Sequence, residues 1–169
     1  MDYIEAPGSF HDAAHPLVFF AGGITGCPDW QAALRDRLQS GGVPGTILNP
    51  RRADFPIHDP TAAQQQIEWE FRALRYADVI SFWFAKETLN PIVLFELGAA
   101  LERVVWRRSC DEVAASPQQL VLGVEPGYAR TQDVQIQSQL VLPSDPPPYA
   151  TSLEALAAVV ATVCRAYQP

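Results

Sequence analysis

Short apolar runs alternate along the chain with longer segments of helical periodicity. The runs of strand length cover residues 17–21, 46–48, 79–84, 120–124 and 140–142. The helical segments cover residues 30–38, 62–76, 91–106, 129–137 and 152–166. Runs that are apolar on both faces are typical of parallel strands, because helices cover both sides of such a sheet. The pattern therefore predicts an α/β fold: a five-stranded parallel sheet flanked by helices, a sandwich of the flavodoxin or Rossmann type.

Turn signals separate these elements, and none of them is typical of a linker between domains. The stretch "SGGVPG" precedes the second apolar run, and "PSDPPPY" precedes the last helical segment. A length of 169 residues with 48% hydrophobic composition suits one domain with a sizeable core. We therefore expect residues 1–16 to form an N-terminal arm and residues 17–169 to form a single domain.

The charge balance disfavours several classes of partner. The net charge is −7, from 19 acidic and 12 basic residues, whereas nucleic acids and anionic membranes attract basic surfaces. The opening "MDYIEAPGSFHDAAHP" has acidic residues where a signal peptide carries positive charge, and no apolar run is long enough to span a bilayer. We expect a cytoplasmic protein that binds neither a nucleic-acid polymer nor a membrane.

The cysteines and histidines lack the spacing of a metal site. Cys27, Cys110 and Cys164 are scattered without a C-x-x-C pair, which predicts reduced thiols. The three histidines fall in expected loops without ligand spacing. We expect no metal and no cofactor.

One carboxylate, Glu96, interrupts the apolar stretch "PIVLFELGAAL". Burying an ionised carboxylate without a partner costs several kcal/mol, roughly. Asn90 is a good N-cap and Pro91 a good first helical residue, so Glu96 falls in the second turn, where the helix dipole favours negative charge. Two interpretations remain: an ion pair with an arginine such as Arg51 or Arg52, or a role in a reaction.

The helical segment over residues 62–76 carries a second candidate carboxylate, Glu70. The spacing of Ile67, Phe71 and Leu74 predicts a buried stripe, and Glu70 lies on the same face. The alternative is a glutamate at the edge of the surface that pairs with a nearby arginine.

The two carboxylates suit glycosyl chemistry if they project into one cleft. Ligands of parallel sheets bind outside the carboxyl ends of the strands. There, one ionised carboxylate attacks or stabilises an oxocarbenium-like carbon, while a second carboxyl with a raised pKa handles the proton of the leaving group. No other pair of side chains in the sequence fits a catalytic role as well.

Two further segments are candidates for ligand contact. The glycine stretch "AGGITG" follows the first apolar run, where it could cradle a phosphate or a sugar or simply form a tight turn. It matches neither the dinucleotide-binding fingerprint nor the P-loop. In the aromatic run "FWF", Trp83 lies near a strand end, where it would either join the core or wall a pocket for a ring.

Three blocks of sequence carry a resemblance to a known family. They are "VFFAGGITG", "EFRALRYADVISFWF" and "NPIVLFELGAAL". The chain resembles the nucleoside 2-deoxyribosyltransferases and their relatives, the deoxynucleoside monophosphate N-glycosidases. The resemblance implies that Glu96, in "FELG", is the nucleophile. It also implies that Glu70, in place of the family's aspartate, handles the proton.

The resemblance also shows departures that bear on the substrate. Asn90 stands where the transferases have a further aspartate, and Phe19 stands where they often have tyrosine. The monophosphate glycosidases have a serine and an arginine in the glycine loop, where this chain has Gly23 and Thr25. This difference disfavours a phosphorylated substrate unless the arginines of "NPRR" bind the phosphate.

The family binds the base beside the loop after the second strand and often completes each site with a neighbouring subunit. The match of "QDVQIQSQL" to the donated region points to Asp133. The resemblance therefore implies a homo-oligomer, a dimer or larger. Together, residues and resemblance predict that the substrate is bound by Phe19, Gly22, Gly23, Thr25, Asn49, Arg51, Arg52, Trp83, Asn90 and Asp133.

The resulting expectation is an enzyme that cleaves the N-glycosidic bond of nucleosides or deoxynucleosides and passes the sugar to a free nucleobase or to water. Three alternatives stay open. The first is a nucleoside 5′-monophosphate N-glycosidase, and the second is a non-catalytic sensor that binds a nucleoside or nucleotide. In the third, Glu96 is purely structural and pairs with an arginine.

Overall fold

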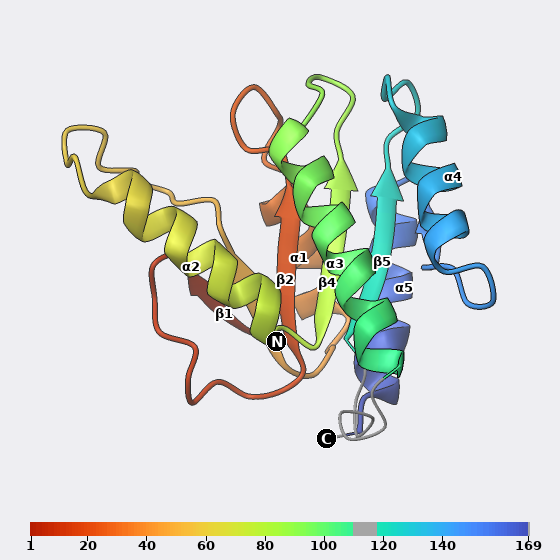
Figure 1. Ribbon diagram of the computed structural model, residues 1–169. Coiled ribbons are helices and arrows are strands. Elements are labelled where there is room, and N and C mark those ends of the chain that lie inside the picture. Colours follow the sequence, from red (N-terminus) through yellow and green to blue (C-terminus); the bar gives the residue numbers. More distant parts are fainter. Residues whose placement is uncertain (110–117, 169) are drawn as a thin grey trace.

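The computed structural model describes residues 1–109 and 118–168, which form one domain with a single parallel sheet. The strands follow the order β1-β3-β2-β4-β5-β6 across the sheet (Figure 1). Their bounds are β1 (Asp2–Glu5), β2 (Leu17–Gly22), β3 (Thr46–Asn49), β4 (Val79–Phe84), β5 (Gln119–Val124) and β6 (Tyr149–Ala150). The predicted α/β class and parallel sheet are confirmed, with six strands in place of five.

Helices cover both faces of the sheet (Figure 1). Their bounds are α1 (Trp30–Ser40), α2 (Ala62–Tyr76), α3 (Pro91–Ser109), α4 (Thr131–Val141) and α5 (Leu153–Ala166). Buried side chains of α2, α3 and α4 share one core cluster, and those of α1 and α5 share another on the opposite face. Since successive strand residues point to opposite faces, each central strand contributes to both clusters.

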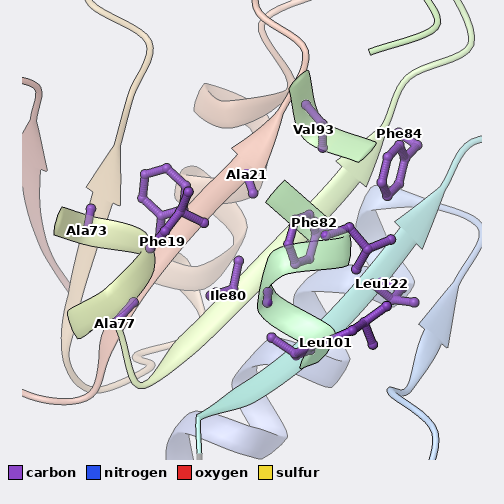
Figure 2. Close-up of a cluster of buried hydrophobic side chains, with 14 of the residues drawn as sticks. Phe19, Ala21, Ala73, Ala77, Ile80, Phe82, Phe84, Val93, Leu101 and Leu122 are labelled. Atoms are coloured by element: carbon purple, nitrogen blue, oxygen red, sulfur yellow. The ribbon is translucent and has the colours of Figure 1, made fainter. Parts of the chain in front are cut away.

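Figure 2 shows the cluster under α2 and α3, with Phe19 and Ala21 of β2 beside Phe82 and Phe84 of β4. These side chains are at most 1% exposed. Phe82 and Phe84 stack at 6.2 Å between ring centroids. The central strands are therefore fixed side by side by a dry apolar layer, and the segments that follow them at the carboxyl ends are held close together.

The order of the strands creates a crevice at the carboxyl ends of β2 and β4. The chain runs from β2 to β3 on one side of β2, and then crosses back to β4 on the other side. The connections that leave β2 and β4 therefore diverge, and the gap between them is the position where open α/β sheets bind ligands.

Two elements differ from the sequence-based scheme. The strand predicted over residues 140–142 is wrong, because α4 continues to Val141 and the sixth strand forms at Tyr149–Ala150. Three apolar residues fit the end of an amphipathic helix as well as they fit a strand. The predicted N-terminal arm contains an edge strand, since Asp2–Glu5 pairs with Thr46–Asn49.

Of the buried stripe predicted for α2, Leu74 is confirmed at 8% exposure, whereas Ile67 and Phe71 are wrong. Ile67 is 65% exposed and Phe71 is 58% exposed, whereas Trp69 and Ala73 are at most 1% exposed. The large ring of Trp69 packs against the ring of Phe19, with 6.2 Å between the centroids. The side of the helix that carries Trp69 therefore faces the core. The first turns of α2 extend away from the sheet (Figure 1). Ile67 and Phe71 each lie two positions from Trp69, on the opposite side of the helix, so they face away from this core.

Candidate active site

A pocket of about 330 Å³ opens in the crevice at the carboxyl ends of β2 and β4. The glycine loop after β2 forms one wall, the start of α3 forms another, and α2 closes a third side. The lining residues are Phe19, Ala21, Gly22, Gly23, Ile24, Thr25, Pro50, Glu70, Thr88, Asn90, Pro91, Ile92, Val93 and Glu96. The structure thus brings both predicted carboxyls into one cavity of a size that suits a small ligand.

Glu96 lies in the second turn of α3, and its carboxyl is largely buried in this pocket. Burial, and after it the nearby charge of Glu70, raise the pKa of Glu96 to about 8. The helix dipole favours the ionised form of Glu96, but these two effects act against it. Desolvation and like charge outweigh the dipole, which is strongest within the first turn.

No arginine or lysine among the described residues forms a salt bridge with Glu96. Arg51, an arginine considered as its partner, points elsewhere: its Nε donates to Gln31 Oε1 at 2.9 Å. The interpretation of Glu96 as half of a structural ion pair thus loses its physical basis, because the carboxyl gains nothing that offsets its burial.

Glu70 faces the same pocket from α2. Burial raises its pKa, and a hydrogen bond of 2.7 Å from Gln66 Nε2 to Glu70 Oε1 acts in the opposite direction. Gln66 Nε2 also donates to Pro50 O at 2.7 Å, which ties this part of α2 to the segment after β3. Gln66 therefore fixes the orientation of the Glu70 carboxyl, and Glu70 acts on Glu96 through its charge.

Two positions of the glycine loop, Gly22 and Gly23, have no room for a side chain. A Cβ on Gly22 would collide with the Trp30 ring and lie 2.6 Å from Trp83 O, and a Cβ on Gly23 would collide with the Asn90 amide. Trp30 Nε1 donates to Gly23 O at 2.8 Å. The two glycines are thus required because the loop passes directly over neighbouring side chains and backbone.

Arg51 holds the far end of this loop through hydrogen bonds to its backbone carbonyls. Its Nη2 lies 3.0 Å from Ile24 O, 3.3 Å from Cys27 O and 3.0 Å from Pro28 O. With its Nε bound to Gln31, the guanidinium is committed to protein acceptors. Arg51 lies outside the pocket lining, so its predicted contact with substrate is replaced by a role in holding the loop.

Asn90 organises the connection between β4 and α3. Its Nδ2 donates to Ala85 O at 3.1 Å and to Thr88 O at 3.0 Å, and its Oδ1 accepts from Thr88 Oγ1 at 2.8 Å. Its backbone adopts φ 47°, a left-handed conformation that asparagine tolerates better than most residues. Asn90 lines the pocket, but its amide is committed to this turn.

Four other predicted binding residues lie outside the pocket lining. Asn49 donates to the Tyr3 hydroxyl at 2.7 Å, and Arg52 lies over the Phe55 ring at 5.2 Å. Trp83 is buried in the opposite core cluster, where its ring covers Gly123. Asp133 is on α4, 3.8 Å from Arg130, beside a separate groove between α3 and α4.

Residues that sequence reasoning missed complete the site. Gln66 holds Glu70, and Thr88, Ile92 and Val93 line the cavity. A signal for Gln66 existed, because it precedes Glu70 by four residues and helix neighbours at this spacing face each other. The others are neighbours of the motif residues in sequence: Thr88 precedes Asn90 by two residues, and Ile92 and Val93 follow Pro91.

The cysteines, the groups that could bind a metal and the helices of the described residues add three findings. Cys27 and Cys164 are free thiols, while Cys110 lies outside the described residues. In the part of the chain that the structure describes, no three His, Cys, Asp or Glu side chains gather so as to hold a metal ion. No helix in the same part has the length and apolar character needed to cross a membrane.

Fold and site define the class: an α/β protein with two glutamates in a pocket at the crevice of its parallel sheet. A family model described as nucleoside 2-deoxyribosyltransferase like matches residues 15–110, more than half of the chain, and this segment contains both glutamates and the glycine loop. The chain belongs to the nucleoside 2-deoxyribosyltransferase-like family, as its three sequence blocks predict. No curated protein matches the chain.

Proposed function

We propose that the protein is an enzyme that cleaves the N-glycosidic bond of nucleosides or deoxynucleosides through Glu96 and passes the sugar to another base or to water. The observation that carries this proposal is the pair of Glu70 and Glu96 in one small pocket, with burial raising the pKa of both carboxyls. Paired carboxyls with shifted pKa values are the machinery that glycosyl transfer requires.

The proposed reaction proceeds in two displacements. In the first, the ionised Glu96 carboxylate attacks the anomeric carbon and forms an ester, while the bond from that carbon to the base breaks and its electron pair leaves with the base. Glu70 delivers a proton to the departing base. In the second, a nitrogen of another base or a water oxygen attacks the same carbon, the ester bond to Glu96 breaks, and Glu70 takes up the proton that the attacking group loses.

The protonation of Glu96 in the free enzyme determines how the reaction starts. With its pKa near 8, Glu96 holds a proton at neutral pH, whereas its attack requires the ionised form. When the substrate is bound, this proton passes to Glu70, which delivers it to the departing base. A rise of kcat/KM with pH follows from this assignment, because kcat/KM reports the ionisation of the free enzyme.

The lining of the pocket favours an uncharged sugar over a sugar phosphate. None of its lining residues is a lysine or an arginine, and two are carboxyls. A phosphate would meet like charge without a cation to bind it. Because Arg51 is committed to Gln31 and the glycine loop, it offers no substitute. A nucleoside is therefore favoured over a nucleoside monophosphate.

The deciding experiment incubates the purified protein with deoxynucleosides, ribonucleosides and deoxynucleoside monophosphates, with and without a free acceptor base, and separates the products by chromatography. A swapped base would identify a transferase, and free base alone a hydrolase. Glu96→Gln abolishes either activity, whereas Glu102→Gln, an exposed glutamate on the same helix, keeps it. Binding of nucleosides without any released base would overturn the proposal in favour of the sensor.

A homo-oligomer belongs to the same proposal. The outer face of α3 presents an apolar stripe of Ile92, Phe95, Ala99 and Trp106, interrupted by exposed Glu102, with Phe95 76% exposed and Ile92 66% exposed. Self-complementary faces of this kind pack about a two-fold axis. Because Ile92 also lines the pocket, a second copy packed on the stripe would lie at the pocket mouth.

A further inference from the structure

A second cavity, of about 430 Å³, lies on the same face of the sheet as the carboxyl pair but near the opposite end of the strands. The segment of residues 7–15 and the C-terminal half of α2 enclose it, with Leu17 of β2 behind them. No residue lines both this cavity and the carboxyl pocket. Its volume falls in the range of small-ligand sites.

Aromatic rings form the walls of this cavity and are held in place by the protein itself. Trp69 Nε1 donates to Gly8 O at 2.7 Å, and the Phe10 ring meets the Trp69 ring edge to face at 5.8 Å. Tyr76, on the last turn of α2, is 68% exposed and adds a further ring at the rim. The site is therefore preformed for a flat apolar group.

The polar groups of the cavity are all cationic or neutral. Arg72, His11 and His15 line it, and no aspartate or glutamate does, although the net charge of the protein is −7. Asp78 Oδ2, 2.6 Å from His15 Nδ1, fixes the imidazole from outside the lining, and Asp12 Oδ1 lies 2.9 Å from His11 Nδ1. The cavity thus selects against cations and offers donors to an anion.

The guanidinium of Arg72 is the donor best placed for this purpose. The residue is exposed, and its only hydrogen bond within the described residues runs from Nε to Glu68 O at 3.3 Å. Its terminal N–H groups are therefore available to the planar oxygens of a carboxylate or to a phosphate, which a guanidinium binds through two parallel hydrogen bonds.

We propose that this cavity is a second binding site and that its ligand is a small aromatic anion, a planar ring that carries a carboxylate or a phosphate. The ring packs between Phe10 and Tyr76, and the anionic group binds Arg72 at the rim. The site is independent of the proposed function, because its residues are separate from the carboxyl pair.

The test is titration calorimetry with phenyl phosphate and with benzoate as probes. Each binds saturably at millimolar concentration or below. Benzyl alcohol, which keeps the ring without the charge, and inorganic phosphate, which keeps the charge without the ring, bind at least about 10-fold more weakly. The stronger of the two anionic probes identifies the preferred anionic group.

Variants assign the binding to this cavity. Arg72→Gln weakens the better probe at least about 10-fold. Arg75→Gln removes a guanidinium that lies over Phe71 on the same helix, outside the cavity, and leaves binding unchanged. Glu96→Gln also leaves it unchanged. Absence of saturable binding up to about 10 mM, or binding that survives Arg72→Gln, or binding that Glu96→Gln abolishes, would overturn the proposal.

Discussion

At the scale of single residues, the chemistry of the protein depends on a carboxyl held where water solvates it poorly. Glu96 is half-buried without an ion-pair partner among the described residues, and desolvation and the charge of Glu70 raise its pKa to about 8. A group in this state lowers the stability of the fold whenever it is ionised. Such a cost is typical of a functional site, since an isosteric amide would remove it.

Replacing Glu96 with glutamine tests how much the ionised carboxylate lowers the stability of the fold. Between its ordinary pKa of 4.5 and its value of about 8 in the fold, the folded chain holds a proton that the unfolded chain releases, so stability falls as pH rises. We expect Glu96→Gln to be more stable than wild type at pH 9 by roughly 2–4 kcal/mol, with the difference vanishing near pH 4. Urea unfolding across this range measures it, with Glu102→Gln as control. A variant less stable at pH 9 would indicate a structural ion pair.

Glu70 acts on the same carboxyl through its charge. Glu70→Gln removes the negative charge that helps to raise the pKa of Glu96, so the rising limb of kcat/KM against pH should move to lower pH. Turnover itself should fall by about 10²–10⁴-fold because the proton donor is lost. The pH profile separates this role from a structural one. An unmoved limb would show that the two glutamates are not coupled.

At the scale of elements, the site depends on how three connections meet. The loop after β2 needs glycine at Gly22 and Gly23 because neighbouring groups occupy the space of a Cβ. Arg51 holds the end of that loop through backbone carbonyls, and Asn90 folds the turn before α3 onto it. The position of Glu96 is therefore set by the turn that begins its helix.

The substitution of Asn90 by aspartate, the residue that the transferases have at this position, should destabilise the protein. Asn90→Asp replaces an amide that donates to Ala85 O and Thr88 O with a carboxylate that faces both oxygens. We expect a loss of about 2 kcal/mol in the free energy of unfolding, measured by urea denaturation. Thr88→Val, which removes one donor to the same amide, serves as control and costs about 1 kcal/mol. Equal stability of Asn90→Asp and wild type would contradict the assigned hydrogen bonds.

At the scale of the whole molecule, the crossing back from β3 to β4 places the pocket between β2 and β4, and α3 carries its outer apolar stripe beside the pocket mouth. Catalysis and assembly are therefore proposed on two faces of one helix. The buried face of α3 packs on the sheet through Val93, Leu97 and Leu101.

The stripe on α3 gives a test of assembly. Phe95→Glu should convert an oligomeric wild type into a monomer, because it places a charge in an apolar contact. Sedimentation velocity at equal protein concentration measures the change. Leu140→Glu, which alters an apolar residue of α4 that is 70% exposed, should leave the oligomer intact. A wild type that sediments as a monomer at all concentrations would contradict the proposal.

Much of this architecture could be predicted from the sequence, and the failures have physical causes. The central strands were predictable because they are apolar on both faces, while β1 and β6 are short edge strands without that signal. Trp83 was assigned to a pocket although alternation along the strand turns it away from the face of Phe82 and Phe84.

The candidate site shows the same limit. Glu96 and Glu70 could be identified because a motif and a helix face point to them. The hydrogen bonds that Arg51 and Asn90 donate could not be identified from the sequence. Their acceptors are backbone carbonyls, which every residue carries and no sequence pattern marks. Sequence reasoning thus located the charged groups of the site more reliably than the hydrogen bonds that hold it together.

The central claim is that Glu96 carries the sugar during turnover. The most direct measurement mixes the protein with a deoxynucleoside that it cleaves, in the absence of acceptor base, quenches the reaction rapidly and maps the peptides by mass spectrometry. We predict a deoxyribosyl group esterified to Glu96, which disappears when acceptor base is added before the quench. Turnover that persists in Glu96→Ala, or a sugar that is never found on this residue while base is released, would contradict the account.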